Sequence, residues 1–387
     1  GANNTAAGKS ALASNTTGAQ NTAVGSASLT ANTTASNNAA LGYEALRDNT
    51  TGASNTAVGH NSLVVNTTGD SNTAMGNFAL LLNTTASNNT AVGLRSLQTN
   101  TTGASNVAVG ASALKANTTA NNNTAVGQSA LFTNTTGTEQ TALGLNALYT
   151  VTTGSQNTGL GSQALTSVTT GSGNTAVGRA AGLAITTGVN NTLIGFNCGD
   201  NLTTGDLCTK VGFNLQESAV GVDNEIMMGT NITGGGANTI RLGNAAGNAT
   251  LNFDGSDTSW AAASDERLKK DITDSTAGLS FINDLRPITY KWKAKDAVSD
   301  TLPQYDADST DPVYGSGKTQ HGFIAQEVKT AIDAHSEIKN GFSMWVEDPD
   351  GTQQVAPSAL VPMLVKAIQE QSALITALTA RITTLEG

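Results

Sequence analysis

The sequence is poor in aromatic side chains and in charge. Phe, Trp and Tyr make up 4% of its 387 residues, and Asp, Glu, Lys and Arg make up 12%. So few large side chains cannot build the core of an ordinary globular domain in the glycine-rich first half. Up to residue 200 the chain has five basic and five acidic residues, so its formal net charge of −10 arises after that point. An acidic chain with no basic patch argues against nucleic acid and anionic membrane surfaces as partners.

Cysteine and long apolar segments are also scarce. The two cysteines, Cys198 and Cys208, lie ten residues apart. We expect buried free thiols, with a local bridge as the less favoured alternative. No run approaches the ~18 apolar residues of a membrane-spanning helix, so no membrane insertion is expected. The three histidines are scattered and no carboxylate pair or metal-ligand spacing stands out, so we expect no cofactor, no metal and no external substrate.

What the sequence does contain is a repeat of 17 residues. An NTAVG-like element begins at residues 4, 21, 38, 55, 72, 89, 106, 123, 140, 157, 174 and 191. Degenerate copies follow in step at Cys208 and Glu225, and another begins at Thr239 after a shortened step. A fixed period of this size is typical of stacked structural units. The β-prone TAVG and the turn residues of NTTG predict that each repeat forms one coil of a parallel β-solenoid, or β-roll.

Alternation within the predicted strand indicates how the coil faces its surroundings. Thr and Val of TAVG point to one side, and Ala and Gly point to the other. Neither side carries charge, so we expect one face to fill the coil and the other to pack against sister chains in a homo-oligomer. Disorder is an alternative for such low-complexity text, but the regular Val and Leu disfavour it. An ice-binding solenoid is a remote alternative, because it needs an exposed, flat threonine ladder.

The C-terminal third has a different composition, and the period disappears. Residues 281–293 predict a short helix, a turn at Pro287, and a strand with three apolar side chains on one face: Ile288, Tyr290 and Trp292. Residues 321–332 predict a glycine followed by an amphipathic helix. Residues 344–356 predict a hairpin around Asp350-Gly351. This pattern indicates a small α+β domain after the solenoid.

The end of the chain carries a heptad pattern. Its apolar seam has Val or Ile at a, Leu at d and one polar position: Val361, Leu364, Ile368, Gln371, Ile375, Leu378, Ile382 and Leu385. A buried helix face is one interpretation, and a coiled coil is the one we favour at a chain terminus. Ile at a with Leu at d favours two strands, which stays in conflict with the trimer expected below.

Several motifs after residue 260 resemble one known family. S-D-x-R-x-K-x-x-I is met by Ser264, Asp265, Arg267, Lys269 and Ile272. P-x-x-Y-x-W follows at 287–292, and G-F-I-A-Q-E-V at 322–328 includes Gly322, Phe323, Gln326 and Glu327. Residues 260–387 thus resemble the intramolecular chaperone that ends phage tail fibres and tailspikes, the endosialidase-type chaperone or peptidase S74. The family often has tyrosine before a Leu-Pro segment, where this chain reads APSALVPML. The repeats more loosely resemble the β-roll heads of trimeric adhesins and fibre shafts.

The resemblance implies a trimeric folding clamp that cuts itself away after assembly. It assigns Ser264 as nucleophile and Lys269 as general base, with the broken bond at or beside Ser264. An uncharged lysine requires a pKa lowered by burial or by neighbouring cations such as Arg267 and Lys270. Residues five apart share no face of a helix or strand, so the pair would meet through a turn or between chains. SDERLKK is also a good helix start, with a serine cap, early acids and later cations.

We therefore expect a mainly β chain with a solenoid shaft at 1–250, a linker at 251–263, a self-cleaving chaperone domain at 264–357 and a coiled-coil helix at 358–387. The expected function is a homotrimeric phage tail-fibre shaft or tip for host attachment, located in the virion and assembled in the host cytoplasm. Expected partners are a glycan or protein receptor on the host cell and other virion tail proteins. A trimeric adhesin-like protein of a bacterial surface is the alternative.

Overall fold

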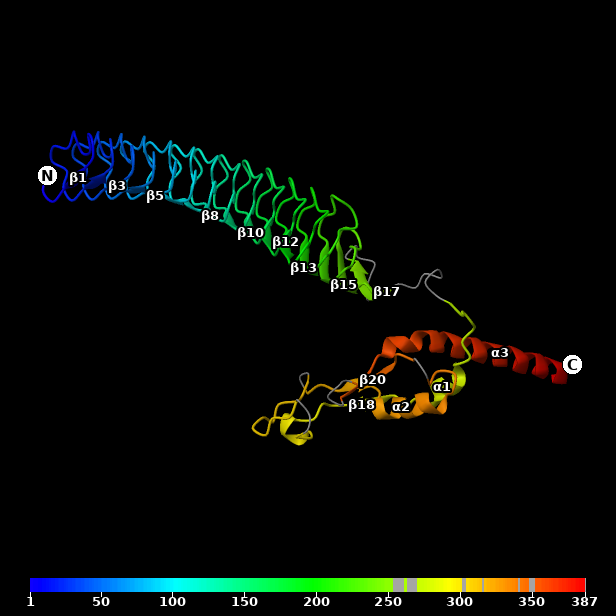
Figure 1. Ribbon diagram of the computed structural model, residues 1–387. Helices are drawn as coiled ribbons and strands as arrows, with labels where there is room; N and C mark the ends of the chain where they lie inside the picture. The colour runs from blue at the N-terminus through cyan, green and yellow to red at the C-terminus, as the bar shows by residue number, and fades with distance from the viewer. Residues whose placement is uncertain are drawn as a thin grey trace. The chain divides into compact units, whose positions relative to one another are not determined.

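The computed structural model describes residues 1–252, 261–262, 270–300, 304–314, 317–339, 342–347 and 352–386. Their contacts divide the chain into two compact units, Gly1–Ser264 and Asp265–Gly387. The first unit is a parallel β-solenoid, and the second is a small α+β domain that ends in a long helix (Figure 1). The predicted fold class, a solenoid of 17-residue repeats followed by an α+β domain, is confirmed.

The solenoid contributes one short strand from each coil to a single sheet. Up to residue 244 neighbouring strands are parallel and in register, as in the pairing of Thr56 with Thr73, and the two strands that follow pair antiparallel. The last parallel step pairs Ile226 with Ile240, which is the shortened step seen in the sequence. The strands of the sheet are β1 (Thr5–Ala7), β2 (Thr22–Val24), β3 (Ala39–Leu41), β4 (Thr56–Val58), β5 (Thr73–Met75), β6 (Thr90–Val92), β7 (Val107–Val109), β8 (Thr124–Val126), β9 (Thr141–Leu143), β10 (Thr158–Leu160), β11 (Thr175–Val177), β12 (Thr192–Ile194), β13 (Thr209–Phe213), β14 (Ile226–Thr230), β15 (Thr239–Asn244), β16 (Gly247–Asn252) and β17 (Ala261–Ala262).

The coil interior is built from small and medium apolar side chains. We number each coil 1–17 from the Asn of NTAVG, so that one coil runs from Asn55 to Ser71. Ala57 at position 3 and Leu63 at position 9 are fully buried, and their equivalents form one continuous core. Thr56 and Val58 on the other side of the strand keep partial exposure. One face of the strand thus fills the coil, as expected, and the structure shows that it is the alanine face.

Two ladders of buried asparagine hold neighbouring coils together. In the first ladder, at position 1, the backbone N–H of Asn55 donates to Asn38 Oδ1 at 2.9 Å, and Asn55 Nδ2 donates to the Gly69 carbonyl at 2.9 Å. In the second ladder, at position 12, Asn66 Nδ2 donates to Asn49 Oδ1 at 2.8 Å and to the Gly69 carbonyl at 2.9 Å. The sequence analysis treated these asparagines only as strand-flanking and turn residues. They are buried because the stacked coils satisfy their polar atoms.

Left-handed residues turn each coil. Gly59 has φ 131°, and a Cβ there would lie 2.7 Å from the carbonyl carbon of the next coil's glycine. Asn61 and Leu63 also have positive φ, 53° and 52°. For leucine this conformation costs roughly 1–2 kcal/mol. The positive φ of Leu63 is stabilised because its side chain fills the core and its N–H donates to the Ala79 carbonyl at 2.9 Å.

Both cysteines are buried free thiols, as predicted. Cys208 occupies position 1, where its N–H donates to Asn191 Oδ1 at 2.8 Å and continues the first ladder. Burial raises the pKa of the Cys198 thiol to about 12. Neither thiol is therefore activated as a nucleophile.

In the described ranges, the second unit consists of three helices, two 3₁₀ turns and two small hairpins. Its elements are α1 (Leu279–Asp284), β18 (Ile288–Tyr290), the 3₁₀ turn η2 (Lys295–Ala297), β19 (Gln320–Gly322), α2 (Ala325–Ala334), β20 (Trp345–Glu347), β21 (Gln353–Val355), the 3₁₀ turn η3 (Pro357–Leu360) and α3 (Val361–Glu386). β18 pairs with β19, and β20 pairs with β21, both antiparallel. The predicted helix and strand at 281–293, the helix after Gly322 and the hairpin are confirmed. None of the helices in the described ranges has the length and hydropathy of a membrane-spanning segment.

Candidate functional site

The predicted cleavage motif lies almost entirely outside the described residues. Ser264, Asp265, Arg267 and Lys269 belong to that part of the chain, so the geometry of the proposed pair stays a prediction. The last motif residue, Ile272, is described and is 61% exposed. In the sequence, the motif lies after the last strand of the solenoid sheet and before the first helix of the α+β domain.

The core of the α+β domain is compact and apolar. Phe281 of α1 and Met344 before β20 are fully buried, and Val328 of α2 is 2% exposed. Ile332 of α2 and Leu360 at the start of the long helix complete the same cluster. The heptad-bearing helix therefore starts from a fixed base, since its first residues are anchored in this core.

Glu370 joins the long helix to α1. Its Oε2 accepts a hydrogen bond of 2.8 Å from the backbone N–H of Leu279, the first residue of α1. The residue before α1 is Gly278, which provides no side-chain cap, and the carboxylate takes that role at the positive end of the helix. Ala367 of α3 is buried, and Met363 packs against the domain core. One face of α3 thus packs against α1 and the core of its own domain.

The predicted seam lies on a different face of α3. Its apolar members have exposed fractions between 42% at Leu364 and 81% at Leu385, and Gln371 is exposed too. The set consists of Val361, Leu364, Ile368, Gln371, Ile375, Leu378, Ile382 and Leu385. An apolar face of this length on a terminal helix is suited to association with other helices.

The GFIAQEV segment links the β18–β19 hairpin to α2. Gly322 pairs with Ile288 in the hairpin, and Phe323 packs against the domain core. Glu327 accepts a hydrogen bond of 3.0 Å from Arg286 Nε, which ties α2 to the segment after α1. Both side chains of this ion pair are largely exposed, so the pair contributes little to the stability of the domain and mainly orients α2 relative to the segment after α1.

An aromatic groove lies beside this segment. It has a volume of about 700 Å³, and Gln326 is one of its lining residues. Ile288, Tyr290 and Trp292 also line it, which agrees with the predicted shared face. The rings of Tyr290 and Trp292 meet edge to face at 5.2 Å, and Trp292 meets Tyr314 at 4.9 Å. Mutual packing of the rings accounts for this Y-x-W motif.

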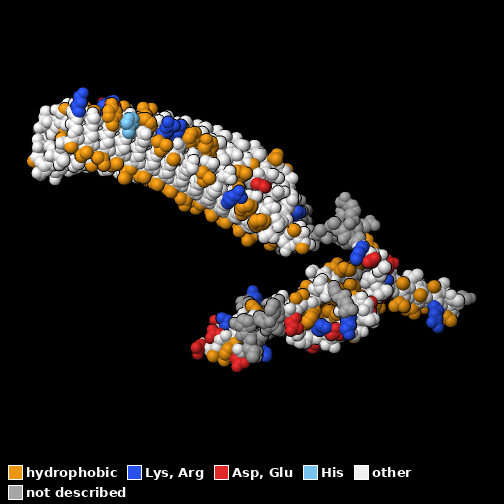
Figure 2. Space-filling view, viewed as in Figure 1, with side chains coloured by type: hydrophobic (Ala, Val, Ile, Leu, Met, Phe, Trp, Pro, Cys, Tyr) orange, Lys and Arg blue, Asp and Glu red, His pale blue; other side chains and the backbone are white. Residues whose placement is uncertain are grey.

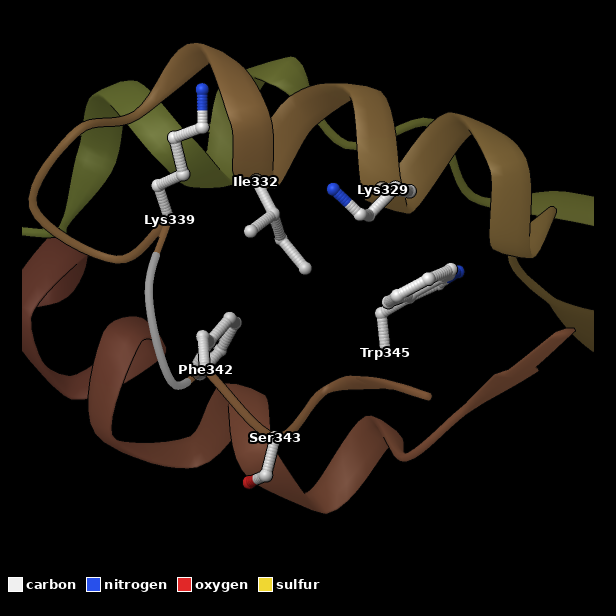
Figure 3. A pocket seen from close by; sticks show the side chains of 6 residues that line it. All are labelled: Lys329, Ile332, Lys339, Phe342, Ser343 and Trp345. Carbon is white, nitrogen blue, oxygen red and sulfur yellow. The ribbon is translucent and has the colours of Figure 1, made fainter. Parts of the chain in front are cut away.

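A second hollow of about 350 Å³ lies between α2 and β20 (Figure 3). Its lining includes Lys329, Lys339, Phe342 and Trp345. Lys329 Nζ lies 2.5 Å from Asp333 Oδ2 and 5.2 Å from the centre of the Trp345 ring. The ion pair within α2 and the contact with the Trp345 ring together hold the Lys329 side chain in place. In the described ranges, no group of three or more His, Cys, Asp or Glu could hold a metal ion.

His335 connects the ends of α1 and α2. Its Nε2 lies 2.8 Å from Asp284 Oδ2, and its Nδ1 lies 3.0 Å from Glu337 Oε1. The hydrogen bond to Asp284 raises the pKa of His335 above its ordinary value. The sequence analysis did not identify His335, Asp284 or Glu370, because no spacing in the sequence announces contacts between residues so far apart.

Comparison with known families agrees with this arrangement. Residues 264–336 match the family described as chaperone of endosialidase. The match begins at Ser264 and covers α1, β18, β19 and α2, whereas β20, β21 and α3 lie beyond it. No curated protein and no solved structure matches the chain. A solenoid followed by this domain fits a fibre or endosialidase-type protein with a C-terminal chaperone. Residues 264–336 are therefore similar to the chaperone-of-endosialidase family.

Proposed function

We propose that this chain is the shaft or tip of a phage tail fibre whose C-terminal domain brings three chains together and is then released by self-cleavage beside Ser264. The observation that carries the proposal is the exposed apolar seam of α3 on a domain of the chaperone-of-endosialidase family. A host-cell receptor, glycan or protein, and other virion tail proteins are the proposed partners.

The seam supports association of identical helices. Ile368, Ile375 and Ile382 are each more than half exposed. In water, such a row is stabilised when knobs of one helix enter holes of its neighbours. Each fully buried Ile or Leu side chain contributes about 1.5–3 kcal/mol relative to exposure. Several such residues per chain provide a clamp strong enough to hold chains that have not yet folded their shafts.

The solenoid offers a second surface for sister chains. The side chains at position 4 form an uncharged row along the outer face of the sheet, and Figure 2 shows hydrophobic side chains along the solenoid with few charged ones. The most exposed members of this row are Leu41, Met75, Leu143, Ile194, Met228 and Leu242. An apolar row of this length is suited to lateral packing of solenoids.

The need for a chaperone follows from the repeats. The coils carry closely similar short strands, which read Thr-Ala-Val in five of them, so two chains shifted by one repeat would make nearly the same contacts. A clamp at one end prevents such shifted pairing, because it aligns all chains in the same register before the shafts pair. The α3 seam does not share the 17-residue period, and its one polar position, Gln371, disfavours alignments that are shifted by a heptad.

The proposed cleavage uses the Ser264 hydroxyl and the Lys269 amine. Neutral Lys269 would take the hydroxyl proton, Ser264 Oγ would attack the carbonyl of the adjacent peptide bond, and the amine would leave with a proton. Water would then hydrolyse the ester. The shaft would keep all its strands, because β17 ends at Ala262, before the motif.

Denaturing mass spectrometry of freshly expressed protein tests the cleavage. We expect two fragments that meet beside Ser264, and their loss in Ser264→Ala and in Lys269→Ala. Ser275→Ala is the matched control, because this serine follows eleven residues later in the sequence and outside the motif; it should leave the fragments unchanged. An intact wild-type chain would refute the cleavage. Mixing the Ser264→Ala and Lys269→Ala chains distinguishes attack between chains, which restores cutting, from attack within one chain, which does not.

A further inference from the structure

The interior of the solenoid changes in its last coils. Position 3 is alanine or glycine in the coils up to Ala176, but it becomes Leu193, Lys210 and then Met227. Position 9 is leucine up to Leu165 and is then glycine in two successive coils. All three of the new position 3 side chains are fully buried.

The first change is an exchange of volume across the coil. Leu193 occupies the space that leucine fills at position 9 in earlier coils. A Cβ on Gly182 would lie 2.8 Å from Leu193 Cδ1, and a Cβ on Gly199 would lie 2.9 Å from Leu193 Cδ2. The side chain of Leu193 therefore fits between Gly182 of the preceding coil and Gly199 of its own coil, and it does not fit against a coil with leucine at position 9.

The second change is a buried ionic triad. Lys210 Nζ lies 2.7 Å from Glu225 Oε2 and 3.2 Å from Glu217 Oε1, and all three side chains are fully buried. Glu225 Oε1 accepts the N–H of Gly236 at 3.0 Å, and Glu217 Oε2 accepts the N–H of Asn201 at 3.2 Å. The triad thus requires the coils that begin at residues 208 and 225 to lie next to each other.

Repeated coils can stack in a wrong phase. If one coil loops out, residue i pairs with residue i+34 instead of i+17. Between coils with Ala at position 3, Leu at position 9 and both Asn ladders, this costs little more than the contacts of the lost coil. The uniform part of the solenoid therefore does not specify its own phase.

We propose that the last coils, residues 191–238, set the phase in which the solenoid stacks. We call this segment the phase-setting segment. It acts within one chain and does not depend on trimer formation or cleavage.

Each wrong phase at this segment leaves either a buried charge without its partner or a space in the core unfilled. Looping out the coil that begins at residue 208 removes Lys210 and Glu217 and leaves Glu225 buried against Leu193. Looping out the coil that begins at residue 225 removes Glu225 and places Lys210 next to Arg241. Looping out the coil that begins at residue 191 removes Leu193 and leaves Gly182 beside an unfilled space. An unpaired buried charge disfavours such a state by roughly two orders of magnitude or more.

The two native cysteines report on the phase. Cys198 lies in the coil that begins at residue 191, and Cys208 begins the next coil. Both thiols are buried in the correctly stacked chain. Loss of either coil from the stack exposes one thiol to a reagent such as iodoacetamide under native conditions. The fraction of labelled chains after unfolding and refolding therefore measures the wrong phases in which the coil that begins at residue 191 or 208 is lost from the stack.

The test compares the full chain with a triad-free variant, Lys210→Met with Glu217→Gln and Glu225→Gln. Replacing all three charges removes the phase signal while leaving no unpaired charge, so the freshly purified variant should unfold at the same or a higher temperature. After refolding from guanidinium, we expect its labelled fraction to rise at least ~10-fold over wild type. The control, Lys115→Met with Glu139→Gln, changes solenoid charges outside the triad and should refold like wild type.

A charge-swapped variant, Lys210→Glu with Glu217→Gln and Glu225→Lys, keeps one buried ion pair and tests the proposal even if the triad-free chain does not fold. It keeps a cation between coils in the reversed order, and we expect it to refold with protected thiols. The proposal is overturned if the triad-free variant refolds as well protected as wild type, or if the charge-swapped variant is labelled as much as an unfolded chain. A chain that stacks in phase but does not trimerise or cleave would refute the proposed function alone.

Discussion

The second asparagine ladder predicts that the same substitution, Asn→Val, destabilises the solenoid by different amounts at positions 83 and 134. Asn83 lies within the ladder: its Nδ2 donates to Asn66 Oδ1 at 2.9 Å, and its Oδ1 accepts from Asn100 Nδ2 at 2.8 Å. Asn134 ends the ladder, because the next coil has Val151 at this position. Its Oδ1 is buried and has no partner. The same change, Asn→Val, therefore has different consequences at the two sites.

Asn83→Val leaves two buried groups unpaired, Asn66 Oδ1 and one N–H of Asn100. Each costs about 1–3 kcal/mol, so the variant should lose about 2–6 kcal/mol of stability. Asn134→Val removes an oxygen that is already unpaired and leaves one other, Asn117 Oδ1, in the same state. The number of unpaired oxygens does not change, and the expected loss is about 0–1 kcal/mol.

Thermal unfolding followed by circular dichroism, and hydrogen exchange of the coils on either side, measure the two costs. We expect faster exchange in the coils around residue 83 and a lower unfolding temperature for Asn83→Val, with little change for Asn134→Val. Equal destabilisation by both substitutions would show that the ladders do not hold the coils through their hydrogen bonds.

Three further predictions concern the α+β domain. Ile375→Asp should abolish association of the chains, measured by sedimentation, while Ala380→Asp on the opposite side of α3 should leave it unchanged. The raised pKa of His335 means that its bond to Asp284 stabilises the domain fully below about pH 6.5 and that this stability is lost as pH rises through the folded pKa. His335→Gln should therefore flatten the dependence of unfolding temperature on pH, and a pKa at or below the ordinary value in an NMR titration would contradict this. Glu370→Ala removes the cap of α1 and should cost about 1 kcal/mol in denaturant unfolding; an unchanged midpoint would refute that role.

The solenoid was predictable because its signal is repeated. A strand with alternating Thr, Ala and Val, followed by glycine, returns at one spacing, and only stacked coils satisfy that pattern twelve times. The leucines with positive φ were not predictable, because leucine has no intrinsic preference for this conformation. Leu63 adopts it only because contacts with the neighbouring coils compensate for its cost. The buried asparagines were missed because NTTG is also typical of exposed turns.

The domain after the solenoid was predictable to the extent that its contacts are local. The helix and strand of residues 281–293 follow from periodicity and one proline, and the seam of α3 follows from its heptads. The contact of Glu370 with α1 and the bridge of His335 to Asp284 join residues far apart in the chain, and a single sequence carries no sign of them. The proposed pair of Ser264 and Lys269 stays a prediction, since it falls outside the described residues.

Native mass spectrometry of the full chain carrying Ser264→Ala tests most directly whether the C-terminal helix clamps identical chains together. The substitution keeps shaft and chaperone in one polypeptide, so the mass reports the number of chains without interference from cleavage. We predict a species of three chains, each of 39.1 kDa, and its loss in the additional variant Ile375→Asp. A monomer at micromolar concentration without Ile375→Asp, or a species of three chains that persists with Ile375→Asp, would contradict the clamp.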